Sequence, residues 1–332
     1  MANPSIWLHD DAVIPLNHGS FGATPRAIFD EQTALRREIE GDAFTFLVDD
    51  LEAKLDAVRA FVAPRFGLAA AGLALVPNPT FAVNSVLAGL PLRDGDEIVF
   101  TNHGYNACNN AVRRWAERSG ARAVVARVPF PVADPGRVTE AVLAAFTPKT
   151  RLLLVDHVTS PTGLVFPVEE IVKEAQARGA EVLVDGAHAP GMLPLDVQAI
   201  GAEWYTGAFH KWLCAPKGAS FLFTRDDKVA STRPVVTSHG ANAPRTDRSR
   251  YALEFDWTGT IDPTPFLCVP SAIAFVESLH PDGLAGVMRE NRALALAARD
   301  VLASALGVAP PCPPSMIGSL AALELPDGAA DP

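Results

Sequence analysis

Short apolar runs alternate with longer amphipathic segments through the middle of the chain. Apolar runs typical of buried strands cover 73–76, 97–100, 123–128, 152–156, 181–185 and 221–223, with another around Trp204 and Tyr205. Helical periodicity lies between them, over 80–90, 106–119, 137–146 and 167–178. Strands that alternate with helices predict an α/β fold with a mainly parallel central sheet and helices on both faces.

The start of the chain departs from this alternation. Residues 13–22 are predicted to form an extended lead-in that ends in a glycine turn. A helix is expected from Pro25 to about residue 40, with Thr24 as its cap, and a second amphipathic helix over about 48–66.

The C-terminal third is also distinct. Residues 238–265 are rich in Arg, Asp, Gly and Pro, which is typical of an ordered excursion from the sheet. A long helical pattern covers about 284–306, and 320–325 is expected to begin a strand of a small second domain. We therefore expect a lead-in near the active site over 1–22, a large α/β domain over 23–265, and a long helix with a partial small domain over 266–332.

Composition narrows the class of partner. The chain has 332 residues, 48% of them hydrophobic, with a net charge of −10, which disfavours nucleic acid and anionic membranes as partners. No apolar run approaches the roughly 20 residues of a membrane span, and the first residues lack the pattern of a secretory signal. The 4 cysteines are widely spaced without a C-x-x-C motif, so a cytoplasmic location is expected.

Polar side chains with complementary chemistry follow the apolar runs. Asp156 and Asp185 each end a predicted strand, and Thr80 follows another. A later run leads to His210 and Lys211. Ligands of parallel sheets bind beyond the carboxyl ends of the strands, so one cleft is expected to collect these groups. A lysine that forms a Schiff base, paired with a carboxylate that keeps a ring nitrogen protonated, is typical of pyridoxal phosphate sites.

The motifs around these residues resemble the class V aminotransferase family of fold-type-I pyridoxal phosphate enzymes, in particular its isopenicillin N epimerase-like branch. The resemblance covers nearly the whole chain. It is carried by Asp185-Gly-Ala-His188, His210-Lys211-Trp212 with the turn Pro216-Lys-Gly218, Leu16-Asn-His-Gly-Ser-Phe-Gly22, Pro161-Thr-Gly163 and Pro314-Ser-Met-Ile-Gly-Ser319.

The resemblance implies a role for each site residue. Lys211 bonds the cofactor aldehyde, Asp185 contacts the ring nitrogen, and His188 completes the catalytic set. Cofactor contacts are implied for Thr80 and Phe81 in the phosphate turn, Tyr105 over the ring, His157 and Ser160 beside the ring oxygen, and His210 at the phosphate. Ala208 stands where many relatives carry a polar phosphate ligand. Substrate contacts are implied for Asn17, His18 and Phe21.

The same resemblance implies a homodimer with shared active sites. Thr260, in Trp257-Thr-Gly-Thr260, corresponds to a loop that reaches the phosphate of the partner subunit. Relatives also use an arginine of the small domain for the substrate carboxylate, whereas this sequence has no arginine after Arg299. The alternatives for that role are Arg233, Arg245, Arg248 and Arg250.

We expect an amino acid to displace Lys211 from the aldehyde, and the freed amine then to remove the Cα proton. The next step defines the reaction: reprotonation from the opposite face gives epimerisation, loss of a β-substituent gives a lyase, and reprotonation of the cofactor gives an aminotransferase. An epimerase-like reaction is the main prediction, and its second acid is His18, His188 or Tyr105. Cys214 and Cys312 are expected to be structural, which disfavours persulfide chemistry on an enzyme thiol.

Two further classes stay open. Asp156-His157 and Asp185…His188 offer ligands for a metal-dependent hydrolase, although that hypothesis gives Lys211 no role, and we expect no metal. A non-catalytic pyridoxal phosphate-binding homologue is the other alternative. A nicotinamide dehydrogenase is disfavoured because no G-x-G-x-x-G follows the first strands.

Overall fold

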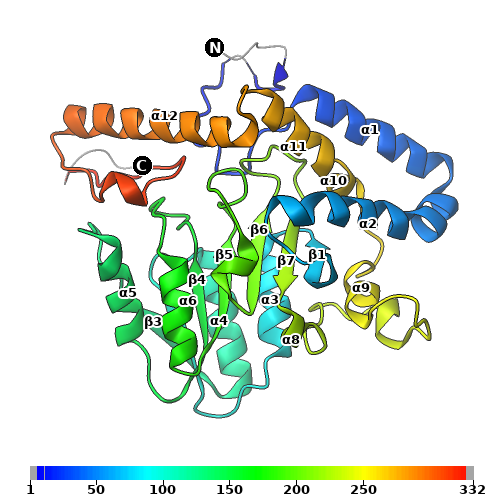
Figure 1. Cartoon of the computed structure of the whole chain (residues 1–332), viewed down its shortest axis with the longest axis horizontal. Helices are drawn as coiled ribbons and strands as arrows, with labels where there is room; N and C mark the ends of the chain where they lie inside the picture. The colour runs from blue at the N-terminus through cyan, green and yellow to red at the C-terminus, as the bar shows by residue number, and fades with distance from the viewer. Residues whose placement is uncertain (1–5, 11, 327–332) are drawn as a thin grey trace.

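A seven-stranded sheet forms the centre of the computed structural model, which describes residues 6–10 and 12–326 (Figure 1). Its strands are β1 (Leu73–Val76), β2 (Glu97–Thr101), β3 (Arg122–Ala126), β4 (Thr150–Asp156), β5 (Glu181–Gly186), β6 (Trp204–Ala208) and β7 (Ser220–Thr224). Their order is β1-β7-β6-β5-β4-β2-β3. Among these strands, β7 points in the opposite direction to the other six, so the predicted mainly parallel sheet is confirmed.

Alternate strand residues pack into two separate cores, one on each face of the sheet. In β2, Val99 belongs to one core, whereas Ile98 and Phe100 belong to the other. The first face is covered by α2 (Leu51–Val62), α5 (Pro135–Ala144), α6 (Val168–Ala177), α7 (Val197–Ile200) and α11 (Val269–Ser278). The second face is covered by α3 (Pro79–Gly89), α4 (Asn106–Ser119) and α9 (Arg250–Phe255).

The remaining helices lie mostly at one end of the sheet. In Figure 1, α1 (Arg26–Gly41) and α12 (Gly283–Leu306) lie above the sheet, on the side of the N-terminal segment. The other elements are η2 (Thr45–Asp50), η3 (Ala63–Arg65), η4 (Ala70–Gly72), α8 (Asp226–Val229), η5 (His239–Asn242), α10 (Thr264–Leu267) and η6 (Pro314–Met316). The N-terminal segment and α12 thus frame the space beyond the strand ends.

Three local predictions need correction. Thr24 does not cap α1, because the helix begins at Arg26 with Pro25 in the cap position; the Thr24 hydroxyl instead accepts a hydrogen bond from the Lys217 ammonium (3.3 Å). The helix expected over 48–66 is divided, since a π-helical turn, η2, precedes α2. Residues 320–325 form no strand, because no described strand lies beside them to pair with their backbone. The division into lead-in, large domain and partial small domain stays a prediction.

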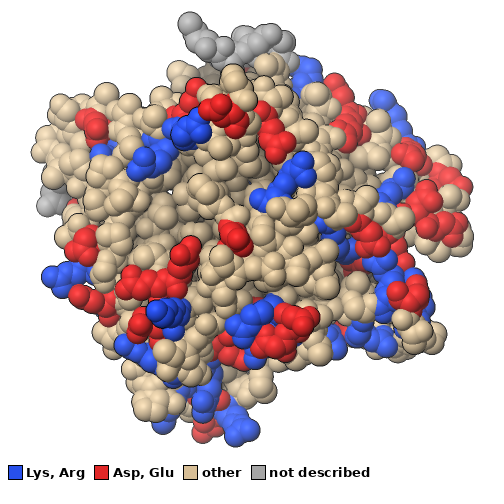
Figure 2. Space-filling view, viewed as in Figure 1, with Lys and Arg blue, Asp and Glu red and all other residues tan. Residues whose placement is uncertain are grey.

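Charged side chains of both signs are mixed on the surface. Lys and Arg are interspersed with Asp and Glu over the face shown in Figure 2, without a continuous basic area. Within the described residues, no helix combines the length and apolar character that a bilayer crossing requires.

Candidate functional site

A pocket of about 450 Å³ lies at the carboxyl ends of β4 and β5. The N-terminal segment, the starts of α3 and α4, and the turn after β6 also contribute to it. Its volume is in the range of small-molecule sites. The lining residues are Asn17, Gly19, Ser20, Phe21, Asn78, Pro79, Thr80, Tyr105, Asp156, Val158, Ser160, Asp185, Ala187, His188, His210, Lys211 and Leu320.

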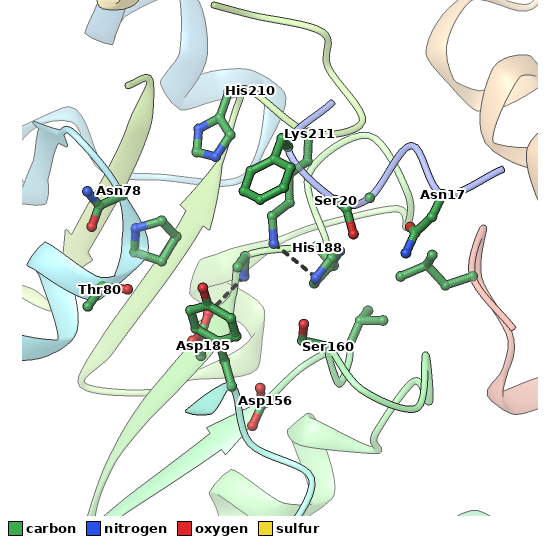
Figure 3. A pocket seen from close by; sticks show the side chains of 17 residues that line it. Asn17, Ser20, Asn78, Thr80, Asp156, Ser160, Asp185, His188, His210 and Lys211 are labelled. Carbon is green, nitrogen blue, oxygen red and sulfur yellow. Dashed lines mark hydrogen bonds between the residues drawn. The ribbon is translucent and has the colours of Figure 1, made fainter. Parts of the chain in front are cut away.

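Lys211 lies in the turn after β6 and extends its amine into the pocket (Figure 3). Its Nζ is 2.9 Å from His188 Nε2. Burial lowers the pKa of Lys211, although the nearby Asp185 carboxylate partly opposes that shift. Burial likewise lowers the pKa of His188 to about 3, so this imidazole is neutral near neutral pH and accepts a hydrogen bond from the amine.

Asp185 lies across the pocket from Lys211, near the end of β5 (Figure 3). Its Oδ1 accepts the Ala187 amide (3.0 Å), and its Oδ2 accepts the Cys108 thiol (3.3 Å). Asp156 occupies the matching position in β4, where it is the register partner of Asp185. Burial raises the pKa of both carboxyls, that of Asp156 well above its usual value, and the Asp185 charge raises it further. Two buried carboxyls thus face one ligand pocket.

Tyr205 supports the end of β5 from the adjacent strand β6. A Cβ placed on Gly186 would lie 2.1 Å from the Tyr205 hydroxyl and 2.2 Å from its ring carbon Cζ, so only glycine fits there. The same hydroxyl is 2.9 Å from His157 Nδ1. Burial lowers the pKa of His157 to about 4. His157 therefore lies behind the pocket wall instead of lining it.

The N-terminal segment is packed against the backbone of the Lys211 turn. His18 Nε2 is 3.0 Å from the Lys211 carbonyl. Gly22 has φ 65°, and a Cβ on it would lie 2.1 Å from the His210 carbonyl oxygen. Phe21 has φ 73° and a side chain that is 76% exposed at the pocket. A bulky residue with left-handed backbone is uncommon away from functional sites, which marks this segment as part of the site.

The start of α3 forms the opposite wall. Asn78 caps the helix, because its Oδ1 accepts the Phe81 amide (2.8 Å), and the Thr80 side chain lines the pocket. The helix N-terminus carries backbone donors and the positive end of the helix dipole, which suits an anion. His210 lies nearby and is 3.0 Å from the Ala219 carbonyl through Nδ1. Burial lowers the pKa of His210, and because its Nδ1 donates to the Ala219 carbonyl, its Nε2 donates to an anion only when the ring is protonated.

The pocket brings together most of the predicted site residues. Those that line it are Asn17, Phe21, Thr80, Tyr105, Ser160, Asp185, His188, His210 and Lys211. His18, Phe81 and His157 lie outside the lining, and Thr260 is exposed elsewhere on the chain. Sequence reasoning did not assign roles to Ser20 or Cys108. Asn78 belongs to the predicted phosphate turn over 78–81, whereas no local pattern marks Cys108.

The pocket contains neither a predicted carboxylate-binding arginine nor, within the described residues, a cluster of metal ligands. None of Arg233, Arg245, Arg248 and Arg250 lines it, so none is placed to bind a substrate carboxylate there. Arg245 and Arg248 instead pair with Glu52 and Asp56. Within residues 6–10 and 12–326, no group of His, Cys, Asp and Glu side chains is arranged to hold a metal ion. The metal-hydrolase hypothesis therefore gains no support from the geometry.

Comparison with known proteins decides the family. The model of the aminotransferase class-V family matches residues 46–308. The chain belongs to the aminotransferase class-V family. Isopenicillin N epimerase of Streptomyces clavuligerus is 35% identical over 97% of this chain and 83% of its own length. A putative L-cysteine desulfhydrase of Oryza sativa is 33% identical over 96% of this chain and 68% of its own length.

Solved structures agree on the class-V fold. A C-DES mutant with glycine covalently linked to its PLP cofactor superposes with a TM-score of 0.73 at 22% identity, covering 92% of this chain and 78% of the other. The prediction of a fold-type-I class-V enzyme that uses pyridoxal phosphate is therefore confirmed.

The pocket of this class-V chain contains the chemical groups that pyridoxal phosphate requires. Lys211 offers a buried amine for the aldehyde, and Asp185 offers a carboxylate for the ring nitrogen. The start of α3, with Thr80 beside it, offers donors for the phosphate, and His210 would add one in its protonated form. His188 Nδ1 is buried without a hydrogen-bond partner among the described residues, so it is free to bond a ligand.

Proposed function

We propose that this chain acts on the Cα–H bond of an amino acid with pyridoxal phosphate, and that its reaction is epimerisation, as in its isopenicillin N epimerase relatives. The observation that carries the proposal is that the Lys211 amine is hydrogen-bonded to His188 in the same pocket as Asp185. Pyridoxal phosphate supplies an aldehyde for amines and a ring that takes up an electron pair.

The residues of the chain divide the proton chemistry among them. The lowered pKa of Lys211 increases the fraction of neutral amine that can accept the Cα proton. His188 is neutral, so it accepts a hydrogen bond from Lys211 and holds the amine in place. Asp185, held by two donors, is placed to keep a ring nitrogen protonated.

Epimerisation needs a second acid, and the geometry favours Tyr105. Of the three predicted candidates, His188 bonds Lys211 and so belongs to the same side as the first base. His18 bonds the Lys211 carbonyl outside the lining. Tyr105 comes from a different wall, at the start of α4, and its side chain is 48% exposed.

The experiment follows solvent deuterium into the amino acid. Purified enzyme with cofactor is incubated in D2O with a panel of L-amino acids and with isopenicillin N, and both configuration and deuterium content are measured. The proposal predicts inversion with one deuterium at Cα. Lys211→Ala should abolish exchange, whereas Tyr105→Phe should retain exchange and lose inversion by about 100-fold or more. Exchange without inversion in the unaltered enzyme would exclude epimerisation.

A C–S lyase is the second candidate, supported by the desulfhydrase relatives. All 4 cysteines are buried, and none lines the pocket, so a thiol that carries persulfide is not available there. Cleavage by loss of the β-sulfur needs no enzyme thiol and uses the same Lys211 base. Release of sulfide and pyruvate from L-cysteine in the same panel would favour this reaction over epimerisation.

We also propose that two copies share each site. Thr260 is exposed and lies outside its own pocket, which fits the role that the resemblance implies, a phosphate contact in the partner. Phe21 at the pocket and Leu16 before it are 76% and 92% exposed, and large apolar side chains of this kind suit burial in a subunit interface.

A further inference from the structure

Cys108 lies behind the pocket, in the first turn of α4. Its side chain is 1% exposed and does not line the pocket. Tyr105, three residues earlier, does line it. The start of α4 therefore places Tyr105 at the pocket and the Cys108 thiol against Asp185.

The thiol completes the hydrogen bonding of the Asp185 carboxylate. The Ala187 amide holds Oδ1, and the Cys108 thiol holds Oδ2. Two donors on different oxygens fix the plane of the carboxylate as well as its position. The other ionisable groups that face Asp185 are Lys211, Asp156 and the Tyr205 hydroxyl, and the thiol is the one among these neighbours bonded to Oδ2.

The sulfur also lies near the start of α3. Burial raises the pKa of the Cys108 thiol, the Asp185 charge raises it further, and the Thr80 side chain partly opposes that rise. Thr80 lines the pocket at the start of α3. One buried sulfur thus lies between the residue expected at the cofactor phosphate and the residue expected at its ring nitrogen.

We propose that Cys108 is a positioning residue of the cofactor site, whose thiol holds Oδ2 of Asp185 from the first turn of α4. The proposal rests on the proposed function, because the benefit of a fixed carboxylate is realised when a ring nitrogen binds to it. A thiol is a weak donor, so it orients the carboxylate and leaves most of its basicity for the ring nitrogen. Valine has a similar volume and no donor, whereas serine has a stronger one.

The test compares Cys108→Val, Cys108→Ser and Cys268→Val as a control for a buried cysteine outside the pocket. Equilibrium affinity for pyridoxal phosphate is measured by titration of each cofactor-free protein, and the near-visible band of the bound cofactor is followed against pH. Loss of one hydrogen bond predicts affinity about three- to tenfold weaker for Cys108→Val, with a displaced titration midpoint. Cys108→Ser should stay near the unaltered affinity, as should Cys268→Val.

An infrared measurement tests the contact without cofactor. The S–H stretch of a thiol that donates to a carboxylate lies at lower frequency than that of a free thiol. The difference spectrum between unaltered protein and Cys108→Ser should contain such a band, and Asp185→Asn should shift it upward. An unshifted band, or equal affinities for Cys108→Val and unaltered protein, would overturn the inference. Failure of the unaltered protein to bind pyridoxal phosphate would overturn the proposed function instead.

Discussion

Gly22 is the point at which the N-terminal segment approaches the Lys211 turn most closely. Any Cβ there would meet the His210 carbonyl, and the backbone also has a left-handed φ of 65°. The segment carries Asn17 and Phe21 into the pocket from this anchor. A single glycine therefore determines how closely the predicted substrate residues lie to the lysine.

We expect Gly22→Ala to lower activity by about 100-fold, because displacing the segment misplaces groups that contact the reacting amine. Gly179→Ala is a matched control, since Gly179 has φ 84° but open space around its Cβ. The control should cost about 1 kcal/mol of stability and leave activity intact. Steady-state kinetics with thermal melting separates the effects, and equal activity losses would refute the close-approach argument.

At the scale of elements, α3 links the sheet to the predicted phosphate contacts. Pro79 occupies its first turn, and Asn78 supplies the cap that orders the following amides. Its neighbour in the second core, α4, contributes Tyr105 and Cys108. Two helix N-termini on one face of the sheet thus hold the ligand from the side opposite the N-terminal segment.

Asn78→Ala should cost about 1 kcal/mol of stability through loss of the cap, and should weaken pyridoxal phosphate binding about three- to tenfold. Ser249→Ala removes a comparable cap, on α9, where Ser249 Oγ accepts the Ala252 amide far from the pocket lining. It should lower the melting temperature similarly without changing cofactor affinity. Calorimetry and cofactor titration provide the comparison, and weakened binding in both variants would point to a global effect.

At the scale of the whole molecule, buried neutral histidines make stability depend on pH. The pKa of His157 falls to about 4 on folding, from its ordinary value of 6.5. The unfolded chain therefore binds a proton first as pH falls, so stability present above about pH 6.5 is lost progressively down to about pH 4. His188, whose pKa falls to about 3, adds to the same trend.

We expect His157 to account for about 2 kcal/mol of the stability lost between about pH 7 and about pH 5. His157→Gln should be less stable at neutral pH, because it alters the contact with Tyr205, and should lose less on acidification. His239→Gln, at an exposed position, should keep the original pH dependence. Urea denaturation at several pH values gives both slopes, and identical slopes for the two variants would contradict the assignment.

Shared sites predict complementation between inactive subunits. Lys211→Ala lacks the amine, and Thr260→Glu should repel the partner's phosphate. In the mixed dimer, one site combines an intact Lys211 with an intact Thr260 from the other subunit. Random reassembly should therefore restore about a quarter of the original activity. Absence of recovery in a purified, differently tagged mixed dimer would show that Thr260 does not serve the partner.

The helices and strands could be predicted from the sequence wherever a periodic or apolar segment had clear ends. The helix predicted over 106–119 and the strand predicted over 73–76 match the structure, because buried elements impose clear periodicity. The expected strand over 320–325 failed because an apolar run becomes a strand only beside a partner. The Thr24 cap failed because the helix begins one residue later than predicted, with Pro25 in the cap position.

The convergence of the main site residues could also be predicted from the sequence. Lys211, Asp185 and Thr80 follow apolar runs, and the carboxyl ends of parallel strands meet, so their convergence could be predicted. His157 could not be placed, because whether a side chain lines a pocket or lies behind it depends on the strand next to it. Cys108 carries no local pattern, and its role depends on the packing of α4 against β5.

Tyr205 and Gly186 constrain how this site can diverge. Replacing the tyrosine with phenylalanine would not make room at 186, since the ring carbon Cζ would still lie 2.2 Å from a new Cβ. A larger residue at 186 must therefore arrive after the ring itself has been lost, as in Tyr205→Leu, and that intermediate forfeits the contact with His157. The two positions are epistatic. Evolution or mutagenesis that changes the packing next to Asp185 must replace Tyr205 before it replaces Gly186.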